Sequence, residues 1–259
     1  MTSGLVGRTA VITGAGRGIG AAISLGLARA GADVILVART AAQLAQSADA
    51  ISARTGSGVR TVVADLGDDG ERERALDEIL ALGPVDILVN NAATVEPLGP
   101  TATVGAQQLR QALEINVIAP IIVGSRLAQG MAGRGWGRIV NVSSSVVAHP
   151  ALMIGGNPYT TTKAALEGHT RNLAAELDGT GVTVNVYRPG GVDTAMQEWI
   201  RNQDPTRVGP GLHDRFVSRY ETGGLISPEE SADALLEHLL GADGARTGAI
   251  WDLRETIAG

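Results

Sequence analysis

A tyrosine and a lysine four residues apart are the first pair of side chains in this chain that could do chemistry. They stand in Tyr159-Thr160-Thr161-Thr162-Lys163, and on a helix this spacing puts both side chains on one face. A phenol titrates near pH ~10, and a neighbouring ammonium lowers that pKa by favouring the phenolate. The pair therefore predicts a proton donor and acceptor, with Tyr159 as the acid/base. Because the spacing also occurs by chance in many helices, the pair alone identifies no activity.

A glycine-rich turn near the start of the chain predicts a site for a pyrophosphate. It reads Thr13-Gly14-Ala15-Gly16-Arg17-Gly18-Ile19-Gly20, between an apolar run and a helix-like segment. Glycines let the backbone turn sharply and let an anion approach the free N–H groups of a helix N-terminus. Ile19 stands where the common dinucleotide fingerprint has its third glycine. A turn that binds nothing is the alternative, but the position at the first strand–helix junction favours nucleotide contacts from Gly14, Gly18, Ile19 and Gly20.

The charges near this turn favour NADP(H) over NAD(H). An NAD site places an acid at the end of the second strand, where it binds the ribose 2′-hydroxyl. Here that strand ends in Ala38-Arg39-Thr40, and Asp33 lies at its beginning. Arg39 can bind a 2′-phosphate, and Arg17 can add a second positive charge. The alternative is that both arginines are solvated surface residues.

The elements that position these residues alternate between strand and helix. Short apolar, β-branched runs predict buried strands at Ala10–Thr13, Val34–Ala38, Val59–Ala64, Ile87–Val89, Ile139–Val142, Val182–Val186 and Ala249–Trp251. Helices are expected at Gly18–Ala30, Ala41–Ala53, Leu109–Met131 and Tyr159–Leu177, with a kink or a new start at Pro120. Capping boxes are expected at Thr40 with Gln43 and at Ser227 with Glu230, and Asp68 is a further expected helix start.

Seven strand–helix alternations predict an α/β fold with a doubly wound, mostly parallel, seven-stranded sheet of the Rossmann type. We expect one dinucleotide-binding and catalytic domain over residues 1–259, because no linker divides the chain. Residues 194–226 are the least regular segment, which predicts a substrate loop or lid.

Composition excludes several other classes of protein. The chain has 259 residues, a net charge of −6 and no cluster of Lys and Arg, so nucleic acid is a poor candidate partner. The absence of cysteine excludes disulfides and thiol nucleophiles and fits a cytoplasmic location. We expect no membrane span, no signal peptide and no metal site, since no histidine has a second ligand at metal spacing.

Taken in order, the motifs of the chain resemble those of the short-chain dehydrogenase/reductase family. Thr13–Gly20 is similar to its cofactor turn, and Asn90-Asn91-Ala92 to its segment after the fourth strand. Asn116, Ser144, Tyr159 and Lys163 match its catalytic tetrad. Further matches are Asp65 with Leu66 after the third strand, and Pro189-Gly190-Gly191-Val192-Asp193-Thr194 near the nicotinamide. The resemblance covers nearly the whole chain.

The resemblance implies a role for each of these residues. Tyr159 exchanges a proton with the substrate oxygen, Ser144 polarises the carbonyl, and Lys163 binds the nicotinamide ribose. Asn116 anchors a water that links Lys163 to solvent. Asp65, Leu66, Asn91, Ala92, Pro189, Gly190, Val192 and Thr194 are expected cofactor contacts. The resemblance also implies a homotetramer or homodimer built on the helices expected at Leu109–Met131 and Tyr159–Leu177.

Three departures from the family pattern matter. Ser144 is chosen because it lies three residues after Asn141, but Ser143 and Ser145 remain alternatives. The gap from Ser144 to Tyr159 is longer than is common, which predicts an altered rim between His149 and Pro158. The ending Trp251-Asp252-Leu253-Arg254 lacks the usual glycines, so the family's C-terminal subunit contacts are in doubt.

The expected function is therefore reversible, NADP(H)-dependent interconversion of a small-molecule carbonyl and an alcohol. A ketoacyl-carrier-type reductase ranks lower, because the segment Glu176–Thr180 after the catalytic helix lacks the basic docking residues. The alternative from another class is a non-catalytic NADP(H)-binding sensor or scaffold.

Overall fold

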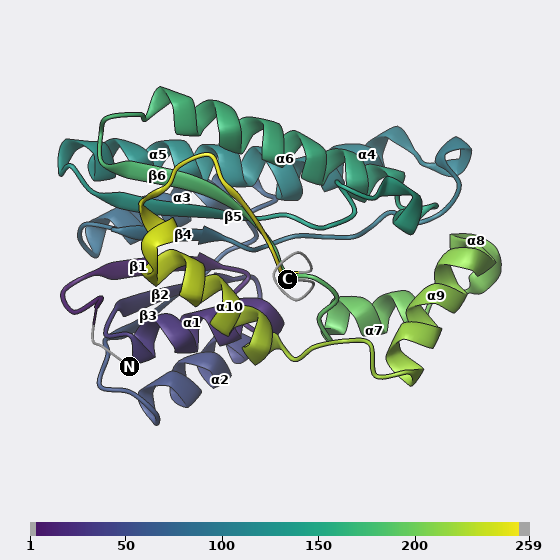
Figure 1. The fold of residues 1–259 in the computed structure, drawn as a ribbon, viewed down its shortest axis with the longest axis horizontal. Coiled ribbons are helices and arrows are strands. Elements are labelled where there is room, and N and C mark those ends of the chain that lie inside the picture. The colour runs from purple at the N-terminus through teal and green to yellow at the C-terminus, as the bar shows by residue number, and fades with distance from the viewer. Residues whose placement is uncertain (1–3, 254–259) are drawn as a thin grey trace.

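Seven parallel strands form one sheet in the order β3-β2-β1-β4-β5-β6-β7 (Figure 1). The computed structural model describes residues 4–253, so Arg254 and the ends of the expected 1–259 domain lie outside the described residues. The strands are β1 (Thr9–Thr13), β2 (Asp33–Ala38), β3 (Val59–Val63), β4 (Ile87–Asn90), β5 (Gly137–Val142), β6 (Val182–Arg188) and β7 (Ile250–Asp252). The predicted doubly wound, parallel, seven-stranded sheet is confirmed.

Helices cover both faces of the sheet (Figure 1). One face packs on α1 (Gly18–Arg29), α2 (Ala41–Ser52) and α10 (Pro228–Leu240), and the other on α3 (Asp69–Ala81), α5 (Ala119–Gly133) and α6 (Asn157–Glu176). Two separate apolar clusters lie on the two faces, one around Ile12 and Ile23 and the other around Leu88 and Met131. Burial on both faces explains why the strands are apolar runs without polar alternation.

The order of strands reverses between β1 and β4, so their connections leave the sheet in opposite directions. Ligands of open α/β sheets bind outside the carboxyl ends of the strands at such a reversal. The glycine-rich turn follows β1 and Asn91 follows β4, which places both at this point.

The helix expected at Leu109–Met131 begins earlier and is interrupted. It consists of α4 (Ala106–Leu113), a π-helical turn (Glu114–Ile118) and α5. Pro120 has no N–H to donate to the carbonyl of Asn116, and the wider turn immediately before it accommodates that missing bond. Pro120 therefore marks the start of α5, one of the two outcomes expected for it, and the helical path continues without a break.

The expectation of an irregular segment over residues 194–226 is wrong. The segment contains α7 (Ala195–Arg201), α8 (Pro205–Val208) and α9 (Pro210–Glu221). Its prolines stand at helix starts, where their fixed φ and missing N–H are tolerated, instead of breaking helices. The side chains of Thr194 and Asp204 cap α7 and α8. Val192, just before the segment, and Ile226, at its end, form a parallel bridge. The three helices between them therefore project together from the body of the sheet (Figure 1).

Two of the three predicted helix caps are confirmed. Asp68 accepts a hydrogen bond from the backbone N–H of Glu71, and Ser227 and Glu230 form a reciprocal capping box. Thr40 is the N-cap of α2, but its side chain accepts no hydrogen bond. Gln43, its expected partner, lies instead against Gly16 of the glycine-rich turn.

Within the described residues, one helical stretch is long and apolar enough to cross a membrane by length and composition. It runs from Ala106 to Gly133, which was not expected from the sequence. Ala119, Val123, Leu127 and Met131 from this stretch are buried in the core beside the sheet. Core helices of this kind are also long and apolar. Length and composition alone therefore do not indicate a membrane span here.

Candidate active site

Thr13 and Asn91 join the carboxyl ends of β1 and β4. The Thr13 hydroxyl accepts hydrogen bonds from the backbone N–H groups of Asn91 and Ala92, at 2.9 and 3.0 Å. The Asn91 side chain donates to the carbonyls of Thr13 and Gly14, at 3.0 and 3.3 Å. These four contacts hold the glycine-rich turn against the segment after β4.

The glycines of the turn are required by close packing as well as by backbone conformation. A Cβ on Gly20 would lie 2.3 Å from the Gly14 carbonyl oxygen and 2.6 Å from the Asn91 amide nitrogen. Gly14 has a φ of +65°, and a Cβ there would lie 2.9 Å from Cα of Ala92. Gly18 has a φ of +57°, and its open side faces Thr194. The turn is therefore a narrow cradle that only glycine can line.

The cradle leads into a helix N-terminus that no side chain occupies. Arg17 is the N-cap of α1, forms no capping hydrogen bond, and is followed by no acidic residue in the first turn. The free N–H groups and the helix dipole therefore remain available to an anion. The residues present fit the pyrophosphate of a dinucleotide.

Arg39 and Arg17 are exposed at the rim of this cradle. The Arg39 guanidinium lies 3.6 Å from the Asp65 carboxylate, and 73% of its side-chain surface is exposed. The other Asp65 oxygen accepts from the Gly67 N–H at 2.9 Å, while Leu66 is buried. At 3.6 Å on the surface, the Arg39–Asp65 pair is a weak interaction that leaves the guanidinium free to turn toward a phosphate.

The structure brings Tyr159, Lys163 and Ser144 together. Tyr159 and Lys163 lie on the first turns of α6, and the Lys163 ammonium is 5.8 Å from the centre of the Tyr159 ring. The Ser144 hydroxyl, in the loop after β5, is hydrogen-bonded to the Tyr159 hydroxyl. Two hydroxyl groups and one ammonium therefore gather at the carboxyl edge of the sheet, the same edge from which the glycine cradle extends.

Burial sets the proton affinities of this pair. It raises the pKa of Tyr159 above its ordinary value, and the hydrogen bond from Ser144 offsets only part of that rise. Burial lowers the pKa of Lys163 to about 8, against the opposing effect of the Glu167 carboxylate. The Lys163 ammonium donates to the Val142 carbonyl at 2.7 Å instead of to Tyr159. Lowering of the Tyr159 pKa by Lys163, expected from the spacing, is therefore not seen in this arrangement, since desolvation dominates.

Lys163 is the only lysine among the 259 residues of the chain. Its exposed fraction is 2%, whereas lysine is a residue that proteins almost never bury unless it is paired. A single lysine, buried next to the predicted acid/base, points to a functional and not a solubilising role.

Asn116 lies in the π-helical turn and is fully engaged. Its side chain accepts from the Thr94 N–H and donates to the Thr94 carbonyl, each at 2.8 Å, and donates to the Thr162 hydroxyl at 3.0 Å. The side chain thus clamps the segment after β4 to α6.

The three serines after β5 have different partners. The Ser143 hydroxyl donates to the buried Glu167 carboxylate at 2.7 Å, which gives it a structural bond away from Tyr159. Ser145 is buried, and its carbonyl accepts from the His149 N–H. The Ser144 hydroxyl acts on the pKa of Tyr159, so Ser144 stays the predicted catalytic serine.

Three charged residues beside the site were not anticipated. Glu167 accepts from Arg188 at 2.8 and 2.9 Å, and Arg188 lies 3.3 Å from Asp252. A signal was present in the sequence, because Arg188 continues the apolar run of β6 into a position that the sheet buries. A buried guanidinium must have a carboxylate partner.

The Pro189–Thr194 segment leads from β6 to the helices α7–α9. Its backbone is held by the bridge of Val192 to Ile226, and Thr194 faces Gly18 across the cradle. Pro189 and Gly190 follow Arg188 directly. The residues predicted to contact the nicotinamide therefore lie between the glycine cradle and α7.

A third apolar cluster, which includes Val95 and Met153, lies beneath helices α7–α9. Tyr159, Met196 and Trp199 each pack against this cluster. The altered rim takes part, since the Gly155 carbonyl accepts from the Gly99 N–H at 2.8 Å. The side of Tyr159 that faces helices α7–α9, where we expect the substrate, is therefore apolar.

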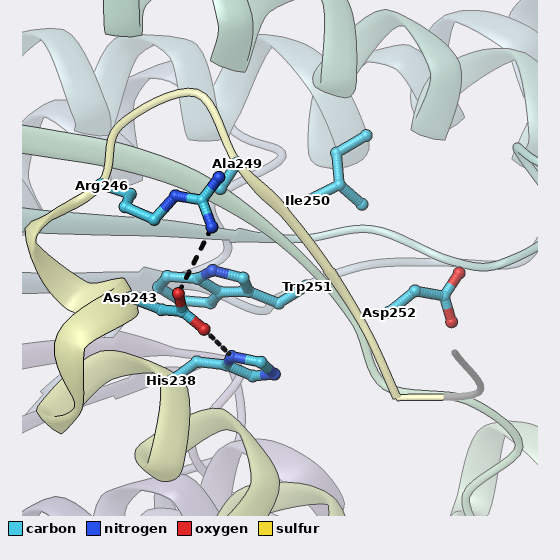
Figure 2. Close-up of a pocket in the computed structure, with 7 residues that line it drawn as sticks. All are labelled: His238, Asp243, Arg246, Ala249, Ile250, Trp251 and Asp252. Carbon is cyan, nitrogen blue, oxygen red and sulfur yellow. Dashed lines mark hydrogen bonds and ion pairs between the residues drawn. The ribbon is translucent and has the colours of Figure 1, made fainter. Parts of the chain in front are cut away.

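Two open cavities in the described residues lie away from the predicted catalytic residues. One, of about 350 Å³, lies between Pro97–Gln108 and the lid residues Thr206 and Arg207. The other, of about 400 Å³, lies beside β7 and is lined by His238, Asp243, Arg246, Ala249, Ile250, Trp251 and Asp252 (Figure 2). Among residues 4–253, no three His, Asp or Glu side chains are grouped closely enough to hold a metal ion.

Comparison with known proteins agrees with this geometry. The family described as short chain dehydrogenase matches residues 8–205. The L-xylulose reductase of Mesocricetus auratus is 37% identical over 252 residues, which is 96% of each chain.

Two solved structures show the same fold with a cofactor bound. The L-sorbose reductase of Gluconobacter frateurii, complexed with NADPH and L-sorbose, superposes with a TM-score of 0.85 at 27% identity, over 98% of this chain and 97% of that chain. A 3-oxoacyl (acyl-carrier-protein) reductase of Agrobacterium tumefaciens C58 with NADP bound gives a TM-score of 0.82 at 31% identity, over 97% and 94%.

Proposed function

The chain belongs to the short chain dehydrogenase family, and we propose that it reduces a small polyhydroxylated ketone reversibly with NADPH. As a member, it is an oxidoreductase that acts on CH–OH and C=O groups. The observation that carries the proposal is the meeting of Tyr159, Ser144 and Lys163 beside the glycine cradle. The likeness to an L-xylulose reductase and to an L-sorbose reductase supports the substrate class.

A bound nicotinamide dinucleotide would supply the hydride. The cradle of Gly14, Gly18 and Gly20 and the N-terminus of α1 would hold its pyrophosphate. Ile19, Asp65, Leu66, Asn91 and Ala92 are proposed contacts along the cradle, and Pro189, Gly190, Val192 and Thr194 are proposed contacts on the nicotinamide side.

The proton steps follow from the polar groups above the cradle. Tyr159 donates its phenolic proton to the substrate oxygen during reduction, and its raised pKa keeps that proton in place at neutral pH. The Ser144 hydroxyl donates a hydrogen bond to the same oxygen and stabilises the charge that develops there. Lys163 supplies a fixed positive charge, and Asn116 holds α6 against the segment after β4.

The proposed preference for NADPH rests on Arg17 and Arg39. Both are exposed at the cradle, and no carboxylate stands at the end of β2, where it would repel a 2′-phosphate. The NADP and NADPH bound in the two solved relatives support this preference.

We expect Arg39→Asp to reverse the cofactor preference. The change removes the cation and adds an acid that can bind the ribose 2′-hydroxyl, so the ratio of kcat/KM for NADPH to that for NADH should fall by about 100-fold. The measurement is initial rates with each cofactor at a fixed ketone concentration. Arg60→Asp on β3 is the control, because it makes the same charge change near the amino end of the sheet. An unaltered ratio in Arg39→Asp would mean that Arg39 does not contact the 2′-phosphate.

The test of the proposed function is a substrate panel. The purified protein is titrated with NADPH and NADH by tryptophan fluorescence, and ketoses, aryl ketones and ketoacyl thioesters are then assayed by loss of nicotinamide absorbance. Highest kcat/KM with ketoses supports the proposal. Much faster turnover of a carrier-linked ketoacyl thioester would replace it with the activity of the carrier-protein reductase.

The proposed assembly is a homotetramer or homodimer in the cytoplasm, formed through the α4–α5 and α6 surfaces. Light scattering coupled to gel filtration measures the mass of the assembly. A monomer would overturn the proposed assembly without affecting the proposed chemistry.

A further inference from the structure

Four charged side chains lie buried together behind the predicted catalytic groups. Glu167, Arg188 and Asp252 have exposed fractions of 5, 7 and 5%, and Lys163 is one helical turn before Glu167. The cluster carries two positive and two negative charges, so it is balanced as a set. Removal of Arg188 would take away the hydrogen-bonded cation that the two buried carboxylates share.

Glu167 is the centre of the cluster. Its carboxylate accepts from the Ser143 hydroxyl at 2.7 Å and from two nitrogens of Arg188, at 2.8 and 2.9 Å. The bidentate pairing with Arg188 fixes the plane of the carboxylate as well as its position. Arg188 is fixed in turn by Asp252 at 3.3 Å.

Each bond of Glu167 leads to a segment that carries a predicted site residue. Ser143 precedes Ser144, Arg188 precedes Pro189 of the nicotinamide segment, and Glu167 itself follows Lys163 by one turn of α6. One carboxylate therefore connects the serine loop, the catalytic helix and the segment after β6.

Stability does not explain such a cluster. A buried ion pair stabilises a fold little more than apolar side chains of the same volume, and often less. The other buried carboxylate with arginine partners, Asp86, pairs with Arg8 and Arg134, whose side chains are 38 and 37% exposed. In the cluster around Glu167, by contrast, Arg188, Asp252 and Lys163 are all buried.

We propose that Glu167 is a positioning residue that fixes these three segments relative to one another and supplies the counter-charge of Lys163, with Arg188 and Asp252 holding it in place. This inference rests on the proposed function for its catalytic consequence. Asp252 lies apart from the linked group of His238, Asp243 and Arg246 in the cavity beside β7 (Figure 2).

The groups that face Lys163 come from several elements. Tyr159 and Glu167 lie on its own helix, and β5 contributes the Val142 carbonyl. Arg188 of β6 and Asp252 of β7 act through Glu167. The π-helical turn contributes the neutral Asn116, while its Glu114 is paired with Arg72. Glu167 is thus the carboxylate that acts directly on the charge of Lys163.

The test is a direct titration of Lys163 in wild type and in Glu167→Gln. Because the chain has one lysine, protein labelled with ¹³C-lysine gives one side-chain NMR signal that needs no assignment. Loss of the counter-charge should lower the pKa of Lys163 by about 1 unit. The kcat for reduction should decrease at high pH as Lys163 loses its proton. In Glu167→Gln this decrease should begin at a pH lower by about 1 unit.

Two variants separate positioning from general stability. Asp86→Asn removes a buried, arginine-bound carboxylate far from Lys163 and should leave its titration unchanged. Glu167→Asp keeps the charge and should keep the pKa close to that of wild type. If Glu167→Gln does not fold, Asp252→Asn leaves Arg188 less compensated and should give a smaller shift in the same direction.

The outcomes are distinct. A titration of Lys163 that is the same in wild type and in folded Glu167→Gln or Asp252→Asn overturns the inference. The titration requires no turnover, so a wild type that reduces no carbonyl would reject the proposed function and still leave the counter-charge measurable.

Discussion

Tyr159→Phe should lower kcat for carbonyl reduction by about 1,000-fold or more while the Kd for NADPH stays within about twofold of wild type. The change removes the phenolic hydroxyl that interacts with Ser144. It keeps the ring, which packs against the apolar cluster that contains Val95 and Met153. Loss of the proton donor therefore occurs with little loss of packing.

The measurement is steady-state reduction of the best ketone, with NADPH binding followed separately by fluorescence. Tyr220→Phe is the matched control, since Tyr220 lies on α9 with half of its surface exposed and stacks on Arg201. Wild-type kcat in Tyr159→Phe would reject the acid/base role and favour the non-catalytic sensor or scaffold.

Lys163→Met should abolish most of the turnover and at the same time stabilise the protein at pH 7. Burial lowers the pKa of Lys163 to about 8, from 10.5 in the unfolded chain. Below pH 8 the charged ammonium is therefore held in the fold against its preference for water. We expect kcat to fall by about 100-fold, and the free energy of unfolding to rise by about 2 kcal/mol.

The pH dependence of this gain has a definite sign. Below the folded pKa both states bind the proton and the destabilisation by Lys163 is complete. Between about pH 8 and 10.5 the unfolded chain binds more protons than the native protein, so the stability of wild type rises with pH. The advantage of Lys163→Met should therefore shrink over this window.

Urea unfolding of both proteins at pH 7 and near pH 10 measures the effect. Arg188→Met is the contrasting variant, because it removes the cation that pairs with the buried carboxylates of Glu167 and Asp252. It should lower the free energy of unfolding by about 3 kcal/mol or more. Equal stability of wild type and Lys163→Met at pH 7 would mean that Lys163 is not held charged against burial.

The sheet and the cradle were predictable because their signals are local. Apolar β-branched runs such as Val34–Ala38 form strands wherever both faces are covered, and the spacing of glycines from Gly14 to Gly20 permits few other backbones. Tyr159 and Lys163 were also predictable, since one helix fixes their relation. The choice of Ser144 over Ser143 rested on the resemblance, and the structure supplies a physical reason in the bond from Ser143 to Glu167.

The parts that sequence could not supply depend on long-range contacts. Residues 194–226 were expected to be irregular because they contain Pro205, Pro210 and several glycines, whereas both prolines begin helices. The π-helical turn at Asn116 depends on Pro120 and on the clamp to Thr94 and Thr162. Glu167 and Arg188 are 21 residues apart, so neither predicts the other by spacing.

The solitary lysine gives the protein an unusual response to lysine-specific proteolysis. An endoproteinase that cuts only after lysine has one target bond, between Lys163 and Ala164, inside α6. Cleavage requires that the helix leave the sheet, because Lys163 is 2% exposed. The rate at which two fragments accumulate therefore measures the opening of the catalytic helix, and a ligand that binds beside Tyr159 should slow it.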